Sequence, residues 1–262
     1  MQTQAVIDYI VNWLDVYLTD SGQNGYVIGI SGGIDSAVTS TLAAMTGRPI
    51  LVLEMPIHQN PDQVSRGKEH IAWLTEKFNN VTSSVVDLTS TFDSFAEAIK
   101  VDKSKKDWEL SLANSRARLR MTTLYYFAGI SRLLVLGTGN KIEDFGVGFF
   151  TKYGDGGVDV SPIADLLKSE IFILAATLGI VDSIQKAEPT DGLWADNRSD
   201  EDQMGASYDE LEWAMQLPAH VSPNDFEGRE KEVVQIFRKL NRAAQHKISP
   251  IPVAKIPKEL KA

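Results

Sequence analysis

Short apolar runs that alternate with helix-like segments constrain the fold of this chain more than any other feature of its sequence. The apolar runs are bounded by turn-forming residues and predict buried strands at residues 26–30, 49–55, 81–88 and 132–137. Apolar residues at helical spacing predict helices at residues 6–18, 36–45, 62–78, 93–100, 108–130, 165–178, 208–215 and 225–246. Strands that alternate with helices indicate βαβ units. We therefore expect an α/β fold, with a doubly wound parallel sheet flanked by helices.

Two stretches interrupt this alternation. Residues 145–162 are rich in glycine and have no clear period, which is typical of a long functional loop. Residues 189–205 are polar and dense in aspartate, so we expect a mobile lid over the ligands there. We interpret the acidic run at 196–202 as a solvated part of this lid and not as a metal site. Because no repeat or linker divides the chain, we expect one domain over residues 1–262.

The overall charge argues against a nucleic-acid-binding protein. The 262 residues contain 26 Lys and Arg against 35 Asp and Glu, which gives a net charge of −9. Such a chain lacks the broad basic surface that nucleic acids or anionic membranes require. The N-terminus has no basic region before an apolar stretch, and no run is long enough to span a membrane. We expect a cytoplasmic protein.

Cysteine is absent, and this excludes several kinds of site at once. The chain has no disulfide framework, no thiolate metal site and no cysteine nucleophile. The four histidines are scattered along the sequence, which makes a zinc site improbable.

The motif with the clearest chemistry lies between the first predicted strand and the following helix. It reads Gly29, Ile30, Ser31, Gly32, Gly33, Ile34, Asp35, Ser36. Glycines permit a tight turn whose backbone N–H groups face an anion, and the helix start adds further donors. An aspartate beside a phosphate requires a divalent cation between them, so the motif predicts Mg²⁺ as well. The alternative is a plain glycine-rich turn in which Asp35 and Ser36 cap the helix.

Two rival nucleotide motifs are missing. No Gly-Lys-Ser/Thr sequence follows a predicted strand, which argues against a Walker-type NTPase. The segment at 137–142 lacks the third glycine of the dinucleotide fingerprint of redox enzymes.

The Ser-Gly-Gly-x-Asp-Ser string resembles the pyrophosphate loop of the N-type ATP pyrophosphatases. Further strings resemble one branch of them, the ammonia-dependent NAD synthetases, along nearly the whole chain. These strings lie at residues 114–121, 137–143, 149–159, 188–191, 199–202 and 205–209. The Phe-Thr-Lys-Tyr-Gly-Asp-Gly-Gly sequence within 149–159 is long and specific. The resemblance implies a Rossmann-like sheet of the adenine nucleotide alpha hydrolase type.

The resemblance also implies an activity. In this family ATP and magnesium adenylylate the nicotinate carboxylate of nicotinic acid adenine dinucleotide, and ammonia then displaces AMP to form NAD. Family members are homodimers whose dinucleotide site straddles the interface. We therefore expect these substrates, Mg²⁺ and a homodimer for this chain.

The resemblance assigns roles to individual residues. It implies catalytic roles for Asp35, Glu143 and Lys168, of which Asp35 and Glu143 are the metal ligands. The implied ATP contacts are the eight loop residues from Gly29 to Ser36, together with Thr138, Lys168 and Thr190. The implied dinucleotide contacts are Arg118, Lys152, Asp159, His246 and Lys247.

Several of these residues also have plainer interpretations. Glu143 is equally readable as a solvated loop acid, Lys168 as a solvated helix lysine and Thr138 as part of a local turn. Arg116, Arg118 and Arg120 occupy alternate positions of one predicted helix, so they cannot all face the same side.

One segment departs from the family pattern. Many bacterial members carry Asp-His-Ala-Ala before the glutamate, whereas this chain has Gly-Asn-Lys-Ile at residues 139–142. The tail after Lys247 also departs from the usual ending.

Two other functions remain open. One is a different ATP pyrophosphatase, such as the partner of a GMP-forming amidase or a tRNA-modifying ligase, although the missing cysteines and basic face argue against these. The other is a non-catalytic nucleotide sensor on the same fold. Glutaminase modules use a cysteine nucleophile, so the absence of cysteine favours free ammonia as the nitrogen donor.

Overall fold

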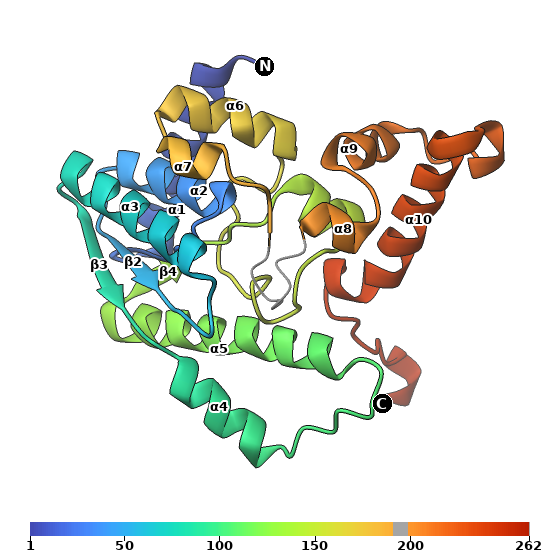
Figure 1. Cartoon of the computed structure of the whole chain (residues 1–262), viewed down its shortest axis with the longest axis horizontal. Helices are drawn as coiled ribbons and strands as arrows, with labels where there is room; N and C mark the ends of the chain where they lie inside the picture. Colours follow the sequence, from blue (N-terminus) through green and yellow to red (C-terminus); the bar gives the residue numbers. More distant parts are fainter. Residues whose placement is uncertain (191–198, 262) are drawn as a thin grey trace.

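A parallel sheet flanked by helices lies in the left part of the molecule as viewed in Figure 1. The computed structural model describes residues 1–190 and 199–261. The strands are β1 (Gly25–Gly29), β2 (Ile50–Glu54), β3 (Val81–Val85) and β4 (Leu133–Val135), in the order β3-β2-β1-β4. All pairs are parallel, which confirms the predicted fold class. The strand order reverses between β1 and β4, and ligands of such sheets bind at the carboxyl ends beside this point.

Two apolar clusters cover the two faces of the sheet. One face packs against α1 (Thr3–Ser21), α2 (Ile34–Met45), α3 (Pro61–Lys77), α6 (Lys168–Leu178) and α7 (Asp182–Gln185). The other face packs against α4 (Thr89–Ala98) and α5 (Trp108–Ser131). The strand residues alternate between the clusters: Tyr26 and Ile28 lie in the first and Val27 in the second. This alternation follows from the pleat of the strands and fixes the direction of every strand side chain.

A third apolar cluster lies beside the sheet. It joins the π-helix η1 (Ile142–Val147), α8 (Asp200–Met204), α9 (Tyr208–Gln216) and α10 (Gly228–Ile248). Two short 3₁₀ segments, η2 (Pro223–Asp225) and η3 (Lys258–Leu260), flank α10. Figure 1 shows α8, α9 and α10 at the edge of the sheet rather than over either face. The prediction of one domain over residues 1–262 stays a prediction.

The structure differs from the sequence interpretation in the bounds of several elements, and three of the differences concern the segments around the predicted site. The π-helix replaces the start of the predicted loop 145–162. Helix α6 begins at Lys168 and not at 165, because Glu170 accepts the Leu167 amide at 2.9 Å and so closes its first turn. The acidic run 196–202 was predicted to be a solvated lid, but its end forms helix α8 and Asp200 is buried. Residues 191–198 of the predicted lid lie outside the described residues.

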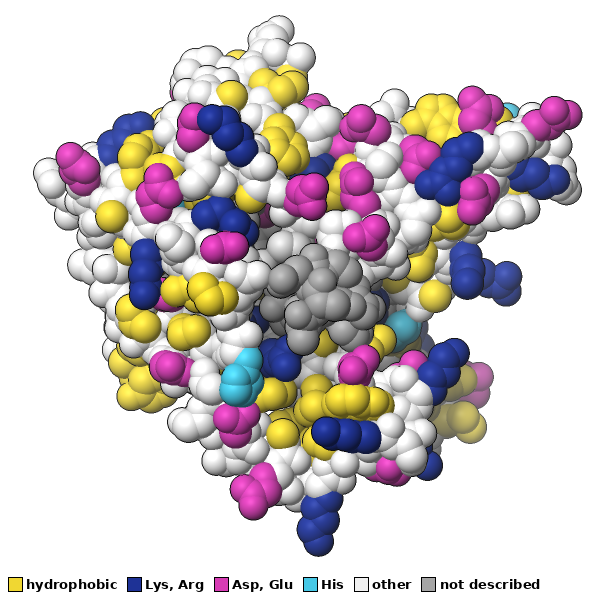
Figure 2. All heavy atoms as spheres, viewed as in Figure 1, with side chains coloured by type: hydrophobic (Ala, Val, Ile, Leu, Met, Phe, Trp, Pro, Cys, Tyr) yellow, Lys and Arg dark blue, Asp and Glu magenta, His cyan; other side chains and the backbone are white. Residues whose placement is uncertain are grey.

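The surface carries mixed charges. Figure 2 shows acidic and basic side chains interspersed on the face viewed, with no continuous basic area. Among the helices of the described residues, none is long and apolar enough to cross a membrane.

Candidate active site

A cavity of about 800 Å³ opens at the carboxyl ends of β1, β2 and β4. It collects nearly every site residue that the sequence predicts. The predicted residues in its wall are Gly29, Ile30, Ser31, Gly32, Gly33, Ile34, Asp35, Ser36, Arg118, Thr138, Glu143, Lys152, Lys168, Thr190, His246 and Lys247. Asp159 does not belong to this wall.

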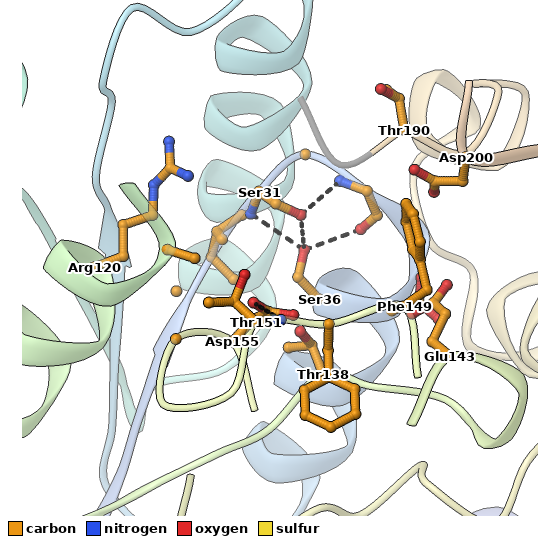
Figure 3. A pocket seen from close by; sticks show the side chains of 18 of the residues that line it. Ser31, Ser36, Arg120, Thr138, Glu143, Phe149, Thr151, Asp155, Thr190 and Asp200 are labelled. Carbon is orange, nitrogen blue, oxygen red and sulfur yellow. Dashed lines mark hydrogen bonds between the residues drawn. The ribbon is translucent and has the colours of Figure 1, made fainter. Parts of the chain in front are cut away.

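The loop from β1 to α2 has the geometry of a preformed anion site. Gly32 has a φ of +80°, and a Cβ there would lie 2.3 Å from the carbonyl oxygen of Gln63, so only glycine fits. Ser31 Oγ accepts the Gly33 amide at 3.2 Å, and Ser36 Oγ donates to the Gly33 carbonyl at 3.0 Å (Figure 3). These bonds link the loop to the first turn of α2. Backbone N–H groups at such a helix start bind phosphate oxygens.

Asp35 and Glu143 meet at the ammonium group of Lys168. Lys168 Nζ lies 2.5 Å from Asp35 Oδ2 and 3.3 Å from Glu143 Oε1. Only 3% of the Lys168 side chain is exposed, against 17% for Asp35 and 15% for Glu143. Asp35 lies in the first turn of α2, Glu143 on the π-helix and Lys168 at the start of α6, so three separate elements build this group.

The charges in this group do not balance. Burial acts against the charge of Lys168, but the two carboxylates outweigh it and raise the pKa of this lysine. Burial raises the pKa of Glu143, and Asp35 adds to the rise, although Lys168 opposes it. The neighbouring Asp144 is half-buried, and its burial together with Glu143 raises its pKa to about 7. When Asp35 and Glu143 are both ionised, Lys168 neutralises only one of their two charges.

Asn140 is a supporting residue that the sequence interpretation missed. Its side chain is fully buried behind the cavity wall. Nδ2 donates to Asp35 Oδ1 at 3.3 Å, while Oδ1 accepts the amides of Ile142 at 3.1 Å and Glu143 at 3.0 Å. Asn140 thereby ties the aspartate after β1 to the glutamate after β4. The sequence held a signal for it, since Asn-x-x-Glu at a helix start is a capping pattern.

Tyr208 and Asp200 complete the surroundings of Glu143. The Tyr208 hydroxyl donates to Glu143 Oε1 at 2.6 Å and lies 3.3 Å from Asp200 Oδ2. Lys168 Nζ lies 4.9 Å from the centre of the Tyr208 ring. Burial and the nearby carboxylates raise the pKa of Tyr208, so its hydroxyl stays protonated. Tyr208 lies in the string at 205–209 that resembles the family, but no local pattern indicates its contact with Glu143, because the two residues are far apart along the chain.

Basic residues from separate parts of the chain form part of the cavity rim. Arg118 of α5 donates to the Lys152 carbonyl at 3.3 Å, and Lys152 Nζ donates to the His246 carbonyl of α10. Lys247 Nζ donates to the carbonyls of Gly148 and Phe150, and its burial lowers its pKa. This rim suits an anionic substrate.

The arginines at alternate positions 116, 118 and 120 of α5 do not all face the cavity, as the helix geometry requires. Arg118 and Arg120 line the cavity, whereas Arg116 lies outside it, with its guanidinium 4.9 Å from the centre of the Phe92 ring. Figure 3 shows Arg120 on one side of the loop serines and Glu143 on the other.

The two predicted ATP-binding threonines lie at the cavity wall, and Asp159 lies apart. Thr138 follows β4, while Thr190 precedes the segment outside the described residues. Asp159 accepts the Val135 amide at 2.8 Å and the Tyr125 hydroxyl at 2.9 Å.

The described residues contain no group of three or more His, Cys, Asp or Glu side chains that could hold a metal ion by themselves. Any ion at Asp35 and Glu143 must therefore take further ligands from elsewhere.

Comparison with known proteins identifies the family. The NAD synthase family model matches residues 6–251. The chain is 39% identical to an NH(3)-dependent NAD(+) synthetase of Mesoplasma florum, over 81% of this chain and 84% of that protein. An NMN synthetase of Francisella tularensis has a similar structure, with a TM-score of 0.85, 28% identity, and coverage of 98% of this chain and 100% of that one. An NH3-dependent NAD synthetase of Campylobacter jejuni shares the fold at a TM-score of 0.75 and 24% identity, over 97% of this chain and 100% of that one.

The matched region contains the loop at residues 29–36, here called the phosphate loop, and the Asp35–Lys168–Glu143 group. It also contains the basic rim formed by Arg118, Lys152 and Lys247, and the family match spans most of the chain. The chain belongs to the NAD synthase family.

Proposed function

We propose that this protein is an ammonia-dependent ligase that forms NAD from nicotinic acid adenine dinucleotide and ATP. The observation that carries the proposal is the single cavity in which the phosphate loop, the Asp35–Lys168–Glu143 group and the basic rim meet. These parts match the needs of the reaction in order: a site for a triphosphate, charge stabilisation at the reacting phosphorus, and a site for an anionic dinucleotide.

The chemistry has two steps. A nicotinate carboxylate oxygen attacks the α-phosphorus of ATP, the bond to pyrophosphate breaks, and an acyl adenylate forms. The nitrogen of ammonia then attacks the carbonyl carbon, AMP leaves, and one proton is released. No side chain becomes covalently attached, so positioning and electrostatics account for the rate.

Each part of the cavity has a role in these steps. The loop from β1 to α2 and the helix start that follows it hold the phosphates that become pyrophosphate. Lys168 balances the negative charge that grows on pyrophosphate as it leaves. Arg118 and Lys152, with Lys247, bind the dinucleotide and orient its carboxylate.

We also propose that Asp35 and Glu143 hold Mg²⁺ during the reaction. Mg²⁺ commonly uses one or two carboxylates and takes its other ligands from substrate phosphates and water, so two acidic residues fit it. The unbalanced negative charge around Glu143 supports this fit. When bound, the ion would neutralise phosphate charge. Titration calorimetry with MgCl₂ and ATP tests the proposal, because Asp35→Asn should weaken the Mg²⁺-dependent part of ATP binding.

The nitrogen donor is proposed to be free ammonia. The relative from Mesoplasma florum is named for this donor. None of the 262 residues is a cysteine, so the chain lacks the usual nucleophile of a glutaminase. Glutamine freed of ammonia should therefore give no amide with the purified protein. Amide formation under those conditions would refute this donor.

We propose a homodimer that packs through α5. This helix exposes apolar side chains away from the sheet, with Tyr126 62% and Ile130 63% exposed. Asp159 is bound to the adjacent Tyr125, outside the cavity. A dimer through this face would explain why a residue expected at the dinucleotide lies there. Sedimentation should show a species of twice the 28.9 kDa chain mass.

A second nicotinate nucleotide is also a candidate substrate. The higher structural similarity is to an NMN synthetase, with a TM-score of 0.85 against 0.75 for the NAD synthetase of Campylobacter jejuni. This observation favours nicotinic acid mononucleotide as an alternative carboxylate substrate. The deciding experiment measures kcat/KM for both nicotinate nucleotides with ATP, Mg²⁺ and ammonium. A higher value for the dinucleotide supports NAD formation, a higher value for the mononucleotide assigns NMN formation, and no AMP with either refutes both.

A further inference from the structure

Glu54 is a buried carboxylate that the proposed reaction does not use. It is the last residue of β2, it lines the cavity, and only 6% of it is exposed. Within residues 1–190 and 199–261, no hydrogen bond or ion pair reaches its carboxylate. Its oxygens are not among the fully enclosed polar atoms that lack a partner, so they are accessible from the cavity. A carboxylate in such a wall needs hydrogen-bond donors from outside the protein to keep its charge. Its place in a cavity wall indicates that a ligand supplies the missing donor.

The pairing of β1 with β2 places Glu54 next to the start of the phosphate loop. Gly29 pairs with Leu53, and the Ile30 amide donates to the Leu53 carbonyl at 2.9 Å. Glu54 therefore lies level with Ile30, one residue before Ser31, on a strand roughly 4.8 Å away. The carboxylate would repel a phosphate at this position, so the group that it contacts must be an uncharged or positive part of the ligand.

The alternation of strand side chains gives the direction of Glu54. Leu53 belongs to the cluster on the α5 side, whereas Val52 belongs to the cluster on the side of α2 and α3. Side chains two residues apart in a strand point to the same face of the sheet, so Glu54 lies on the same face as Val52. At this end of the sheet the α3 residues in the cavity wall are Gln63, Val64, Arg66 and Gly67. The ligand group therefore lies between the end of β2 and α3, beside the phosphate loop.

We propose that Glu54 accepts hydrogen bonds from the ribose hydroxyls of ATP and so selects a ribonucleotide. An ionised carboxylate only accepts hydrogen bonds, and its two oxygens match two adjacent hydroxyl donors. The ribose is joined directly to the phosphates, so it is the first part of ATP beyond the loop. This inference rests on the proposed ATP site and adds a determinant of sugar specificity to it.

The test measures nucleotide binding by titration calorimetry in Mg²⁺ without the second substrate. The ligands are ATP, 2′-deoxyATP and 3′-deoxyATP, and the proteins are wild type, Glu54→Gln and Glu54→Leu. Wild type should bind ATP about 10- to 100-fold more tightly than at least one deoxy analogue, as expected for hydrogen bonds to a charged group. This ratio should fall to about 1 in Glu54→Leu and to an intermediate value in Glu54→Gln, which keeps a neutral acceptor.

Two controls separate this role from a structural one. Glu212→Gln changes another buried acid, which accepts the Ser169 amide and hydroxyl and lies outside the cavity wall, so it should keep the wild-type ratio. Glu54→Leu should melt at or above the wild-type temperature, because it removes a buried carboxylate that has no protein partner. A clear loss of thermal stability would show that the protein itself needs this carboxylate, and would overturn the proposal.

The remaining outcomes also decide the question. An unchanged ratio in Glu54→Leu, or wild-type ratios near 1 for both analogues, overturns the proposal. Purine riboside triphosphate lacks the 6-amino group of adenine and tests the base instead. If Glu54→Leu abolishes discrimination against this analogue but not against the deoxy analogues, Glu54 reads the base and the proposal is wrong. Because the titration omits the second substrate, it gives an answer even if the protein forms no amide.

Discussion

Replacing Lys168 with methionine tests the charge balance at the centre of the cavity. The two ion pairs at 2.5 and 3.3 Å have gross Coulomb energies of about 7 and 5 kcal/mol at an effective dielectric constant near 20. Most of this offsets the burial of the charges, and removing one partner of a buried ion pair typically costs about 3–5 kcal/mol. A chain of this size loses roughly 2–4 °C in Tm per kcal/mol. We therefore expect Lys168→Met to lower Tm by about 6–20 °C at pH 8.

The loss should depend on pH in a defined direction. The pKa of Glu143 is raised in the folded protein, so the folded state binds more protons and stability falls as pH rises from the ordinary carboxyl pKa through the folded value. Without Lys168 the folded pKa rises further and this window widens. Calorimetric scans at pH 8 and pH 5.5 should show a larger loss at pH 8. Mg²⁺ should raise the Tm of the variant more than that of wild type, because it replaces the missing cation.

Lys141→Met is the matched control. Lys141 pairs with Asp165 at 2.8 Å, but the two side chains are 37% and 96% exposed. A surface pair of this kind contributes about 0–1 kcal/mol, so the control should keep nearly the wild-type Tm at both pH values. If Lys168→Met loses no more than the control, or loses equally at both pH values, the account of an under-neutralised carboxylate pair is refuted.

Four further substitutions, at three residues, address the same group. Asp35→Asn should lose Mg²⁺-dependent turnover far more than thermal stability, and equal activity at saturating Mg²⁺ would contradict its metal role. Tyr208→Phe removes the hydroxyl donor to Glu143, so the Glu143 pKa should rise and the acid limb of the kcat/KM profile should shift to higher pH; an unmoved limb would count against this contact. Asn140→Ala should lower the free energy of unfolding in urea by about 1–3 kcal/mol and reduce turnover, because a buried set of hydrogen bonds is lost. Asn140→His keeps a side-chain donor for Asp35 and should retain more turnover than Asn140→Ala, and equal turnover would show that the contact with Asp35 is unimportant.

Local patterns were sufficient to predict the sheet and most helices. The apolar runs are short and bounded by turns, and the amphipathic helices have a clear period, so their positions are encoded nearby in the sequence. Helix α8 was missed because its residues are acidic and show no apolar period. It forms because Met204 packs into the third cluster and Ser199 caps its start, with Asp200 buried against Tyr208. Such tertiary contacts are invisible to a local pattern.

The candidate site also contains some residues that local patterns predict and others that they do not. The phosphate loop could be predicted from the sequence because its glycines and serines are close together, and their spacing itself produces the turn that such an anion site needs. Glu143 and Lys168 were predicted through the family resemblance, since on local grounds each was equally readable as a solvated residue. Their proximity depends on the strand order, which no local pattern gives, because Asp35 follows β1 and Glu143 follows β4 at the point where that order reverses.

The supporting residues suggest why this point of the fold suits the chemistry. Two buried carboxylates repel one another, so a protein that must hold them close needs fixed donors on both. Asn140 supplies a donor to Asp35 while anchoring the backbone at Glu143, and Tyr208 supplies a donor to Glu143. Lys168 then bridges the pair but leaves negative charge in excess. We propose that a site built in this way binds a further cation and a phosphate with little rearrangement, because hydrogen bonds already hold its side chains.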